Sequence, residues 1–320
     1  MEQEKLNNIL APQSEPTVSS SFRTAFGEYK ENFSFLGLVY LPLAALTVFG
    51  IFIPGIAGAA LTFIPGILSA IVTPGFISAI SKNFYPETIS PYGKLKILYK
   101  DGLKYIIPVI WIGILTGLCV FFGIILFVLP GIWLSVVLGY SIYALIFDGK
   151  RGLEALAYSY IYAKNNFWFI IKRTILLGIG FSVVAGVISG FFPPEKKLIS
   201  ELSGDQSFAV TAEVRNSKYY KVFFGEDDPF TYVRQPGDEA LSAIFNNVFA
   251  IPFAMFFVVG VFNLLKKKNA YLVTEEEVTK TKKKIGVLVW LGILLPIIIF
   301  TGLIAIFGGT AILSLQQLLP

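Results

Sequence analysis

Long stretches without a single charged residue alternate with short polar ones along this chain. Asp, Glu, Lys, Arg and His are absent from five blocks, at residues 33–81, 105–147, 174–194, 240–265 and 285–320. A charge inside a bilayer costs about 2.5–3.5 kcal/mol on insertion scales, and about 20 apolar residues cross the hydrocarbon as a helix. We expect two spans in each of the first two blocks, which are long enough to fold back, and one span in each of the others. The pattern predicts an all-α fold, a polytopic membrane bundle of about seven transmembrane helices.

The composition agrees with this class. Hydrophobic residues make up 55% of the chain and charged residues 15%, whereas soluble domains carry about 25% charged residues. The chain has no histidine, which excludes His-metal sites and Ser-His or Cys-His catalysis, and its one cysteine, Cys119, lies in an apolar block. We predict no catalysis, no metal and no cofactor. The net charge of +5 sits beside the spans, so we also expect no nucleic-acid partner.

The basic residues predict how the chain is oriented in the membrane. They gather in three connecting segments, 82–104, 150–173 and 266–284, while the tight turns inside the first two blocks are uncharged. Short basic loops stay in the cytoplasm. We therefore expect a multi-pass protein with its N-terminus in the cytoplasm and, after seven spans, its C-terminus outside. The acidic segment 195–239 then falls on the outer side. Because the protein is predicted to span the membrane, we expect membrane lipids as its partners.

Three copies of one unit follow each other along the chain. Similar residues open each copy, at 28–33, 98–103 and 162–167, and a second span in each copy carries a proline: Pro65, Pro130 and Pro252. We predict a disordered cytoplasmic tail at 1–20 and a bundle of three interface-helix-plus-hairpin units at 21–265. An extracytoplasmic insertion at 193–239, a basic cytoplasmic loop at 266–284 and an extra transmembrane helix with an outer tail at 285–320 complete the division.

Each copy opens on an amphipathic stretch. In the first copy Phe22, Phe26, Tyr29 and Phe33 form a helical stripe, and in the third the stripe is Leu153, Leu156, Tyr160 and Phe167. The second begins at Ser90-Pro91, a serine N-cap followed by proline at the first helical position. Such helices lie in the membrane interface. They are either connectors packed under the bundle or helices that sense lipids.

Four segments occur in a recognisable order: LPGIW at 129–133, IFDGK at 146–150, EALAYS at 154–159 and KNNFW at 164–168. In this order the chain resembles the prokaryotic superfamily around the glycerophosphoryl diester phosphodiesterase membrane domain and related integral membrane families. The likeness is best over 97–180. It implies a prokaryotic inner-membrane protein and a helical fold, and it supplies no catalytic residues. No phosphodiesterase domain follows, so that activity is not implied.

Two groups of residues are candidate sites. Proline bends a helix and frees a carbonyl, so Pro-Gly elements are either hinges in a substrate path or packing kinks; the residues are Pro65, Gly66, Pro130, Gly131 and Pro252. Lysine triplets bracket a short helix with a Thr274–Glu277 capping box. They either fix the topology or contact anionic lipid headgroups, at about 1 kcal/mol per residue; they are Lys266, Lys267, Lys268, Lys282, Lys283 and Lys284.

The insertion predicts a short helix at 195–202 and a β-hairpin with strands at 207–214 and 218–224, a surface for a protein partner. Its acidic run 226–228 is either a cation site or a solvated turn. Polar residues are sparse within the spans, so we expect an apolar barrier filled by Phe63, Ile67, Phe127, Trp133 and Phe256. These features favour a non-catalytic membrane scaffold associated with lipids or the envelope. The alternative is a permease for a small or lipidic substrate.

Overall fold

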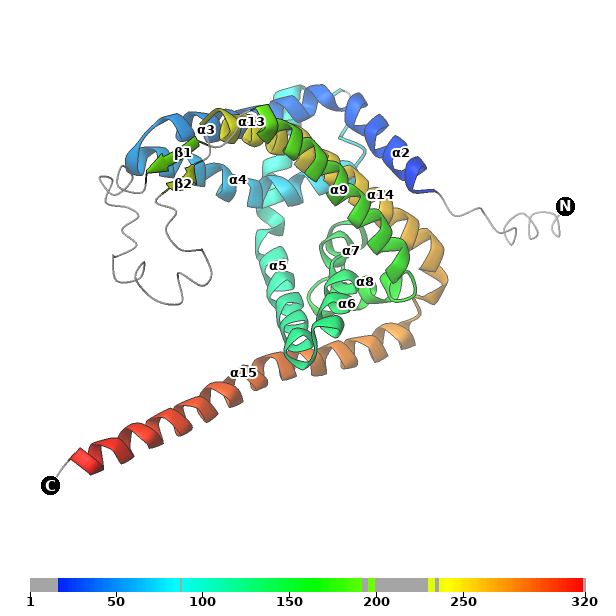
Figure 1. Cartoon of the computed structure of the whole chain (residues 1–320). Helices are drawn as coiled ribbons and strands as arrows, with labels where there is room; N and C mark the ends of the chain where they lie inside the picture. Colours follow the sequence, from blue (N-terminus) through cyan, green and yellow to red (C-terminus); the bar gives the residue numbers. More distant parts are fainter. Residues whose placement is uncertain (1–16, 87, 192–194, 199–229, 234–235, 319–320) are drawn as a thin grey trace. The chain divides into compact units, whose positions relative to one another are not determined.

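The computed structural model describes residues 17–86, 88–191, 195–198, 230–233 and 236–318, except the side chains of 195–198, 230–233, 300 and 302–318. The described chain is almost entirely helical, which confirms the all-α bundle (Figure 1). The elements are α2 Val18–Glu31, α3 Phe33–Phe52, α4 Gly55–Ser81, α5 Pro91–Leu126, α6 Val128–Leu138, α7 Ser141–Asp148, α8 Leu153–Ala163, α9 Phe167–Phe191, β1 Glu195–Leu198, β2 Phe230–Val233, α13 Pro236–Ile244, the π-helix η1 Phe245–Ala250, α14 Ile251–Asn269, the 3-10 helix η2 Ala270–Leu272 and α15 Glu275–Leu318.

Six helical segments of the described chain are long and apolar enough to cross a membrane. They are Phe33–Phe52, Gly55–Ser81, Pro91–Leu126, Val128–Asp148, Phe167–Phe191 and Pro236–Leu272. The protein is therefore an integral, multi-pass membrane protein. The seventh predicted span belongs to α15, a helix of 44 residues. Its side chains at 300 and 302–318 lie outside the described part, so that span stays a prediction.

The described residues fall into two compact units. The first comprises those of Met1–Val39, Ile67–Leu177 and Ile251–Pro320, and the second those of Tyr40–Gly66 and Gly178–Ala250. The unit boundaries lie inside α3, α4 and α9 and between η1 and α14.

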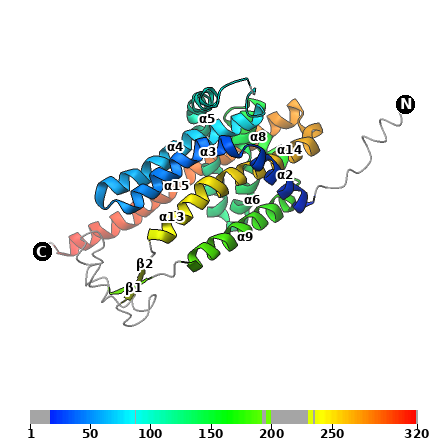
Figure 2. The ribbon, with the colours of Figure 1, turned by 90° about the horizontal axis from the view of Figure 1, so that it is seen from above.

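Helix α2 begins earlier than the sequence suggested. Thr17 caps it by accepting a hydrogen bond from the amide of Ser20 at 3.2 Å, so residues 18–20, expected in a disordered tail, are helical. The serine run resembles a tail in composition, yet a threonine N-cap is what such a helix start requires. The helix lies against α14 in both ribbon views (Figures 1 and 2), where Phe22 packs on Phe253 and Phe257.

The second interface helix and the third span form one helix, α5. Its start is confirmed, because Ser90 accepts a hydrogen bond from the amide of Gly93 and Pro91 is the first helical residue. Phe127, in extended conformation, then turns the chain into α6. A Cβ on Gly131 would lie 2.8 Å from the backbone nitrogen of Ile124, and one on Gly123 would lie 2.9 Å from the Cα of Gly131. Only glycines allow the two helices to approach this closely.

The fourth span is broken between α6 and α7, and Ser159 of α8 satisfies the break. Its hydroxyl donates to the carbonyl of Val137 at 2.7 Å and accepts from the amide of Tyr140 at 3.1 Å. A break in a helix leaves such backbone groups without their partners four residues away, and burying them unpaired is costly. Ser159 is the serine of the EALAYS segment, so this residue has a structural role.

Helix α8, which corresponds to the third predicted amphipathic stretch, is buried among other helices of the first unit. Ala155, Leu156, Ala157, Ile161 and Ala163 are all completely buried. Helices α5, α6, α7, α14 and α15 surround it. The small alanine and serine side chains allow neighbouring helices to approach from several sides. This packing is compatible with the connector packed under the bundle, and the depth of the helix in the membrane stays a prediction.

The second unit holds the rest of the first hairpin and the base of the insertion. Gly50 and Gly58 bring α3 and α4 together, and a Cβ on Gly50 would lie 2.8 Å from the carbonyl oxygen of Gly58. Ser189 of α9 donates to Asp238 of α13 at 3.1 Å. The helix expected at 195–202 is wrong for its first four residues, which form β1 and pair antiparallel with β2. The partner Phe230–Val233 is rich in aromatic and β-branched residues, which favour a strand. The predicted hairpin strands and the acidic run lie outside the described residues.

The core uses other residues than the expected barrier. Phe63, Ile67 and Phe127 are 71%, 54% and 75% exposed, so they do not fill the bundle, whereas Phe256 is buried and Trp133 partly buried. A bundle in lipid gains little by hiding every apolar side chain, so the residue type alone does not tell an inward position from an outward one. The largest fully buried side chains include Tyr40, Phe76, Phe256 and Phe262.

Candidate functional site

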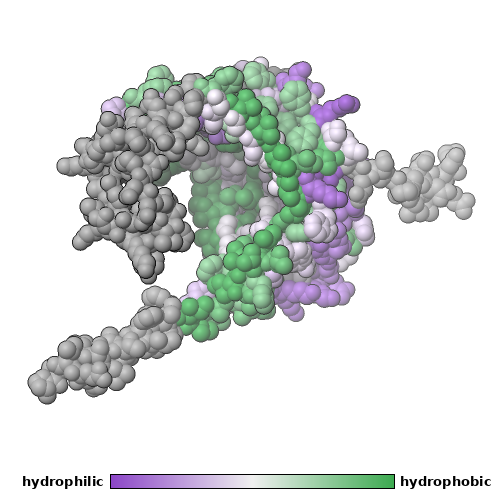
Figure 3. Space-filling view, viewed as in Figure 1, coloured by the Kyte–Doolittle hydropathy of each residue, from purple (hydrophilic) through white to green (hydrophobic). Residues whose placement is uncertain are grey.

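Charged side chains in the first unit pair with each other at the ends of helices. Figure 3 shows hydrophilic residues gathered over α2, the end of α14 and the first turns of α15. Within the described part of the chain, no group of three or more His, Cys, Asp or Glu residues could hold a metal ion. The charged residues of this unit form ion pairs that join different helices.

Asp101 is the centre of the first network. A single carboxylate oxygen, Oδ2, accepts hydrogen bonds from the hydroxyl of Ser78 at 3.0 Å, the ammonium of Lys82 at 2.5 Å and the hydroxyl of Tyr85 at 3.2 Å. The Lys82 side chain is 49% exposed and that of Asp101 16%. Ser78 lies in the last turn of α4 and Asp101 lies in α5, so this carboxylate connects the two helices and the loop between them.

The connection itself is bent into an uncommon conformation. Asn83, Phe84 and Tyr85 have φ values of 49°, 57° and 65°, the left-handed region that residues with a Cβ seldom adopt. Packing holds it, since the Phe84 ring lies 5.8 Å from that of Phe76 and 5.6 Å from that of Phe256. Burial, followed by the charge of Asp101, raises the pKa of the Tyr85 hydroxyl, which keeps it a hydrogen-bond donor. Strain of this kind is retained where the surroundings over-determine it.

Asp148 is the centre of the second network, at the end of α7. It pairs with Lys266 of α14, and the hydroxyl of Tyr162 of α8 donates to it at 3.4 Å. Burial and then Asp148 raise the pKa of Tyr162. The Asn269 side-chain amide donates to the Tyr162 carbonyl at 2.7 Å. This network joins three helices, and the aspartate belongs to the IFDGK segment.

A third pair joins α8 to α15. Lys164 donates to Glu277 at 2.5 Å, and this hydrogen bond is the main reason that the pKa of Glu277 is lowered. The amide of Glu277 also donates to the hydroxyl of Thr274 at 3.2 Å, which confirms Thr274 as the N-cap. The Glu277 side chain binds Lys164 in this pair.

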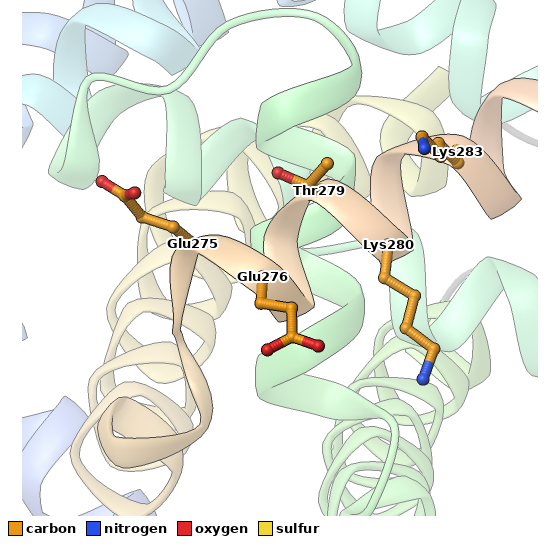
Figure 4. A pocket seen from close by; sticks show the side chains of 5 residues that line it. All are labelled: Glu275, Glu276, Thr279, Lys280 and Lys283. Atoms are coloured by element: carbon orange, nitrogen blue, oxygen red, sulfur yellow. The ribbon is translucent and has the colours of Figure 1, made fainter.

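The structure separates the six lysines of the two triplets. Lys266 is held by Asp148, and the Lys268 ammonium lies 5.8 Å from the ring centre of Phe169. Lys282, Lys283 and Lys284 are exposed on α15. Lys283 belongs to a shallow, open pocket of about 430 Å³ whose lining residues all come from α15, so it is the charged face of one helix (Figure 4). Those residues are Glu275, Glu276, Thr279, Lys280 and Lys283.

Lys284 lines a different hollow. It belongs to an apolar groove of about 380 Å³ between α6, α8 and α15. We call this the α6–α8–α15 groove. Its lining residues are Trp133, Leu134, Tyr160, Thr281, Lys284, Ile285, Val287 and Leu288.

The predicted hinge residues occupy different settings. Pro65 is buried within α4, and a Cβ on Gly66 would meet nothing. Pro130 lies in the first turn of α6, where no helical hydrogen bond is lost, and Gly131 is the close contact with α5. Pro252 is the second residue of α14, which directly follows the π-helix η1. A wider turn there accommodates the ring, which would otherwise clash with the carbonyl four residues earlier. Hinge motion at these residues stays a prediction.

Sequence reasoning missed the residues that organise this unit. Asp101, Asp148 and Ser159 were seen only as parts of repeated or resembling segments, and their partners lie 14 to 118 positions away. Arg173 was assigned to a basic loop, yet it is buried, 3.5 Å above the ring of Phe169, with its Nε donating to Ser21 at 3.4 Å. One signal in the sequence could have indicated Asp101 and Asp148: each is an acidic residue at a position where a predicted span meets a basic loop.

Comparisons with family models, with curated proteins and with solved structures gave no match to this chain. The resemblance to the phosphodiesterase membrane-domain superfamily thus rests on its motif residues alone.

Proposed function

We propose that this integral membrane protein is a non-catalytic scaffold that associates with lipids and organises envelope components in a prokaryotic cell membrane. The proposal places the N-terminus in the cytoplasm and the C-terminus outside, following the basic loops. It also assigns the insertion at 193–239 to a protein partner.

The observation that carries the proposal is the aromatic packing at the centre of the first unit. The ring of Phe262, which is completely buried, is surrounded by Tyr140, Tyr143, Phe147 and Tyr162 at centroid distances of 5.6–6.3 Å. One helical turn and a half earlier in α14, Phe256 packs edge-to-face on Phe76 at 5.5 Å. A path for a polar solute needs groups that replace its hydration. The phenylalanine rings supply none, and the hydroxyl of Tyr162 is already bound to Asp148.

The outward faces of the same unit suit lipid or a partner helix. Large apolar side chains of α5 and α15 are exposed on the isolated chain, among them Ile107, Trp111, Val287 and Trp290. Exposed apolar patches of this kind mark membrane or protein contacts. The paired charges at the helix ends hold the helices together, so the polar residues described above already have a structural use.

A permease is the second candidate, and the π-helix η1 favours it. Such irregular turns are frequent at functional sites, and helices interrupted in membranes often line substrate paths. Within the described residues, the buried hydroxyl of Thr116 also has no hydrogen-bond partner, which a water or solute would satisfy.

Solute flux decides between the two. Purified protein is reconstituted into sealed vesicles, and uptake of small sugars, amino acids, ions and a fluorescent lipid is followed against protein-free vesicles. The scaffold predicts no protein-dependent uptake. Saturable uptake of any of these solutes would replace the scaffold with the permease.

A further inference from the structure

The α6–α8–α15 groove differs from the other surfaces of the first unit because it combines an apolar floor with one cation. Leu134, Ile285 and Leu288 supply aliphatic side chains, and Lys284 lies at the rim. The volume of about 380 Å³ is at the small end of ligand pockets. It suits part of a single acyl chain.

Two aromatic residues border the groove. Trp133 of α6 and Tyr160 of α8 meet edge-to-face, with ring centres 5.6 Å apart. Both are partly exposed. Tryptophan and tyrosine are enriched at the level of lipid headgroups, because one end of each ring system is apolar and the other polar.

The charge pattern of α15 changes at the groove. From Glu275 to Lys284 the helix carries several charges, and from Ile285 onward it carries none. Lys284 is therefore the last charged residue before the apolar part of the helix. A lysine at such a boundary lies where a phosphate headgroup meets its acyl chains.

The cation at the rim is available to a ligand. The neighbouring Lys164, whose ammonium lies 5.8 Å from the ring centre of Tyr160, is already neutralised by Glu277. Within the described part of the chain, Lys284 forms no salt bridge, and its charge is a minor cause of the lowered pKa of Glu277, which is paired with Lys164. An anionic headgroup would complement it.

We infer that the α6–α8–α15 groove binds one membrane phospholipid with an anionic headgroup, its acyl chain along Leu134, Ile285 and Leu288 beside Trp133 and its phosphate at Lys284. The inference rests on the proposed function, because it names the lipid class with which the scaffold associates. The two fail separately: flux overturns the scaffold, whereas the lipid measurement below overturns the groove.

The test uses Trp133 as a reporter. Trp111, Trp168 and Trp290 are replaced by phenylalanine, and the full chain is reconstituted into phosphatidylcholine vesicles. A fixed fraction of lipid carries brominated chains, on either phosphatidylglycerol or phosphatidylcholine, and bromine quenches a tryptophan that it touches. We expect Trp133 to prefer the anionic lipid about fivefold, the ratio that one lysine near a membrane surface provides.

Matched variants locate the effect. Lys284→Gln should bring the lipid preference close to one, and Lys284→Arg should keep it. Lys283→Gln should leave it unchanged, because Lys283 lines the open pocket on α15 (Figure 4) and is absent from the lining of the groove. A protein with Trp290 as its single tryptophan should be quenched equally by both lipids, since this side chain is exposed on α15. Equal quenching of Trp133 by the two lipids, no quenching by either, or the same loss with Lys283→Gln and Lys284→Gln would overturn the inference.

Discussion

At the residue scale, single side chains fix how the helices of the first unit meet. Asp101 receives three donors on one oxygen and so determines the strained turn at 83–85. Ser159 repairs the break between α6 and α7. In both cases the side chain supplies hydrogen-bond partners to polar groups around it, as expected for polar atoms inside a helical bundle.

Replacing Asp101 with asparagine should lower the stability of the protein by about 1–2 kcal/mol. The change keeps an acceptor oxygen but removes the charge, and the loss is moderate because Lys82 is half exposed to solvent. Tyr85→Phe, which removes one hydrogen bond, should cost about 1 kcal/mol. The denaturation midpoint in detergent micelles measures both. If Asp101→Asn left the denaturation midpoint unchanged, the network would not be what stabilises the turn.

The Lys164–Glu277 pair predicts a dependence on pH. The folded protein lowers the pKa of Glu277 from its ordinary value of 4.5. The ionised carboxylate therefore stabilises the fold above that value, and the contribution is lost as the pH falls from 4.5 through the lowered pKa. Glu277→Gln should be less stable than the natural protein at pH 7, and the difference should vanish in acid. For the control Glu276→Gln, the difference in stability from the natural protein should be small at both pH values. A stability difference for Glu277→Gln that persists in acid would contradict the proposed role of the Lys164–Glu277 pair.

At the scale of elements, the sequence predicted the spans well and their packing poorly. Charge-free blocks locate α3, α4, α5 and α9 because the bilayer excludes charge, whatever the neighbouring helices do. The extent to which α8 is buried was not predicted, because alanines are uninformative in a hydrophobic periodicity, yet Ala155, Ala157 and Ala163 are fully buried. The hydrogen-bond partners of Asp101 and Asp148 include residues of other helices. A local sequence pattern does not show which helices become neighbours in the fold.

The hairpin of α5 and α6 depends on its glycines. Gly131→Ala places a Cβ 2.8 Å from the Ile124 backbone nitrogen, so it should cost about 1–3 kcal/mol through overpacking. Gly117→Ala is the matched control in α5, where a Cβ would meet nothing, and should be neutral or up to about 1 kcal/mol stabilising. Thermal denaturation in detergent compares the two. If both behaved alike, the close contact at Gly131 would not exist.

At the scale of the whole molecule, the orientation in the membrane is the first prediction. In a Cys119→Ser background, an impermeant thiol reagent on intact cells should label Ser203→Cys and Gln317→Cys, while Ser14→Cys and Lys267→Cys should react only after permeabilisation. Lys267 is exposed on α14, so a cysteine at this position can react with the reagent. Labelling of Lys267→Cys on intact cells would reverse the topology.

The central claim is that aromatic packing closes the middle of the bundle to water. Val259 and Val261 of α14 lie between Phe256 and Phe262 and are each 2% exposed, and cysteine replaces valine with little change in volume. In open membranes of the Cys119→Ser protein, a water-soluble thiol reagent should modify Lys267→Cys and leave Val259→Cys and Val261→Cys unmodified until the protein is denatured. Modification of either valine position in the folded protein, at a rate near that of Lys267→Cys, would contradict the closed bundle.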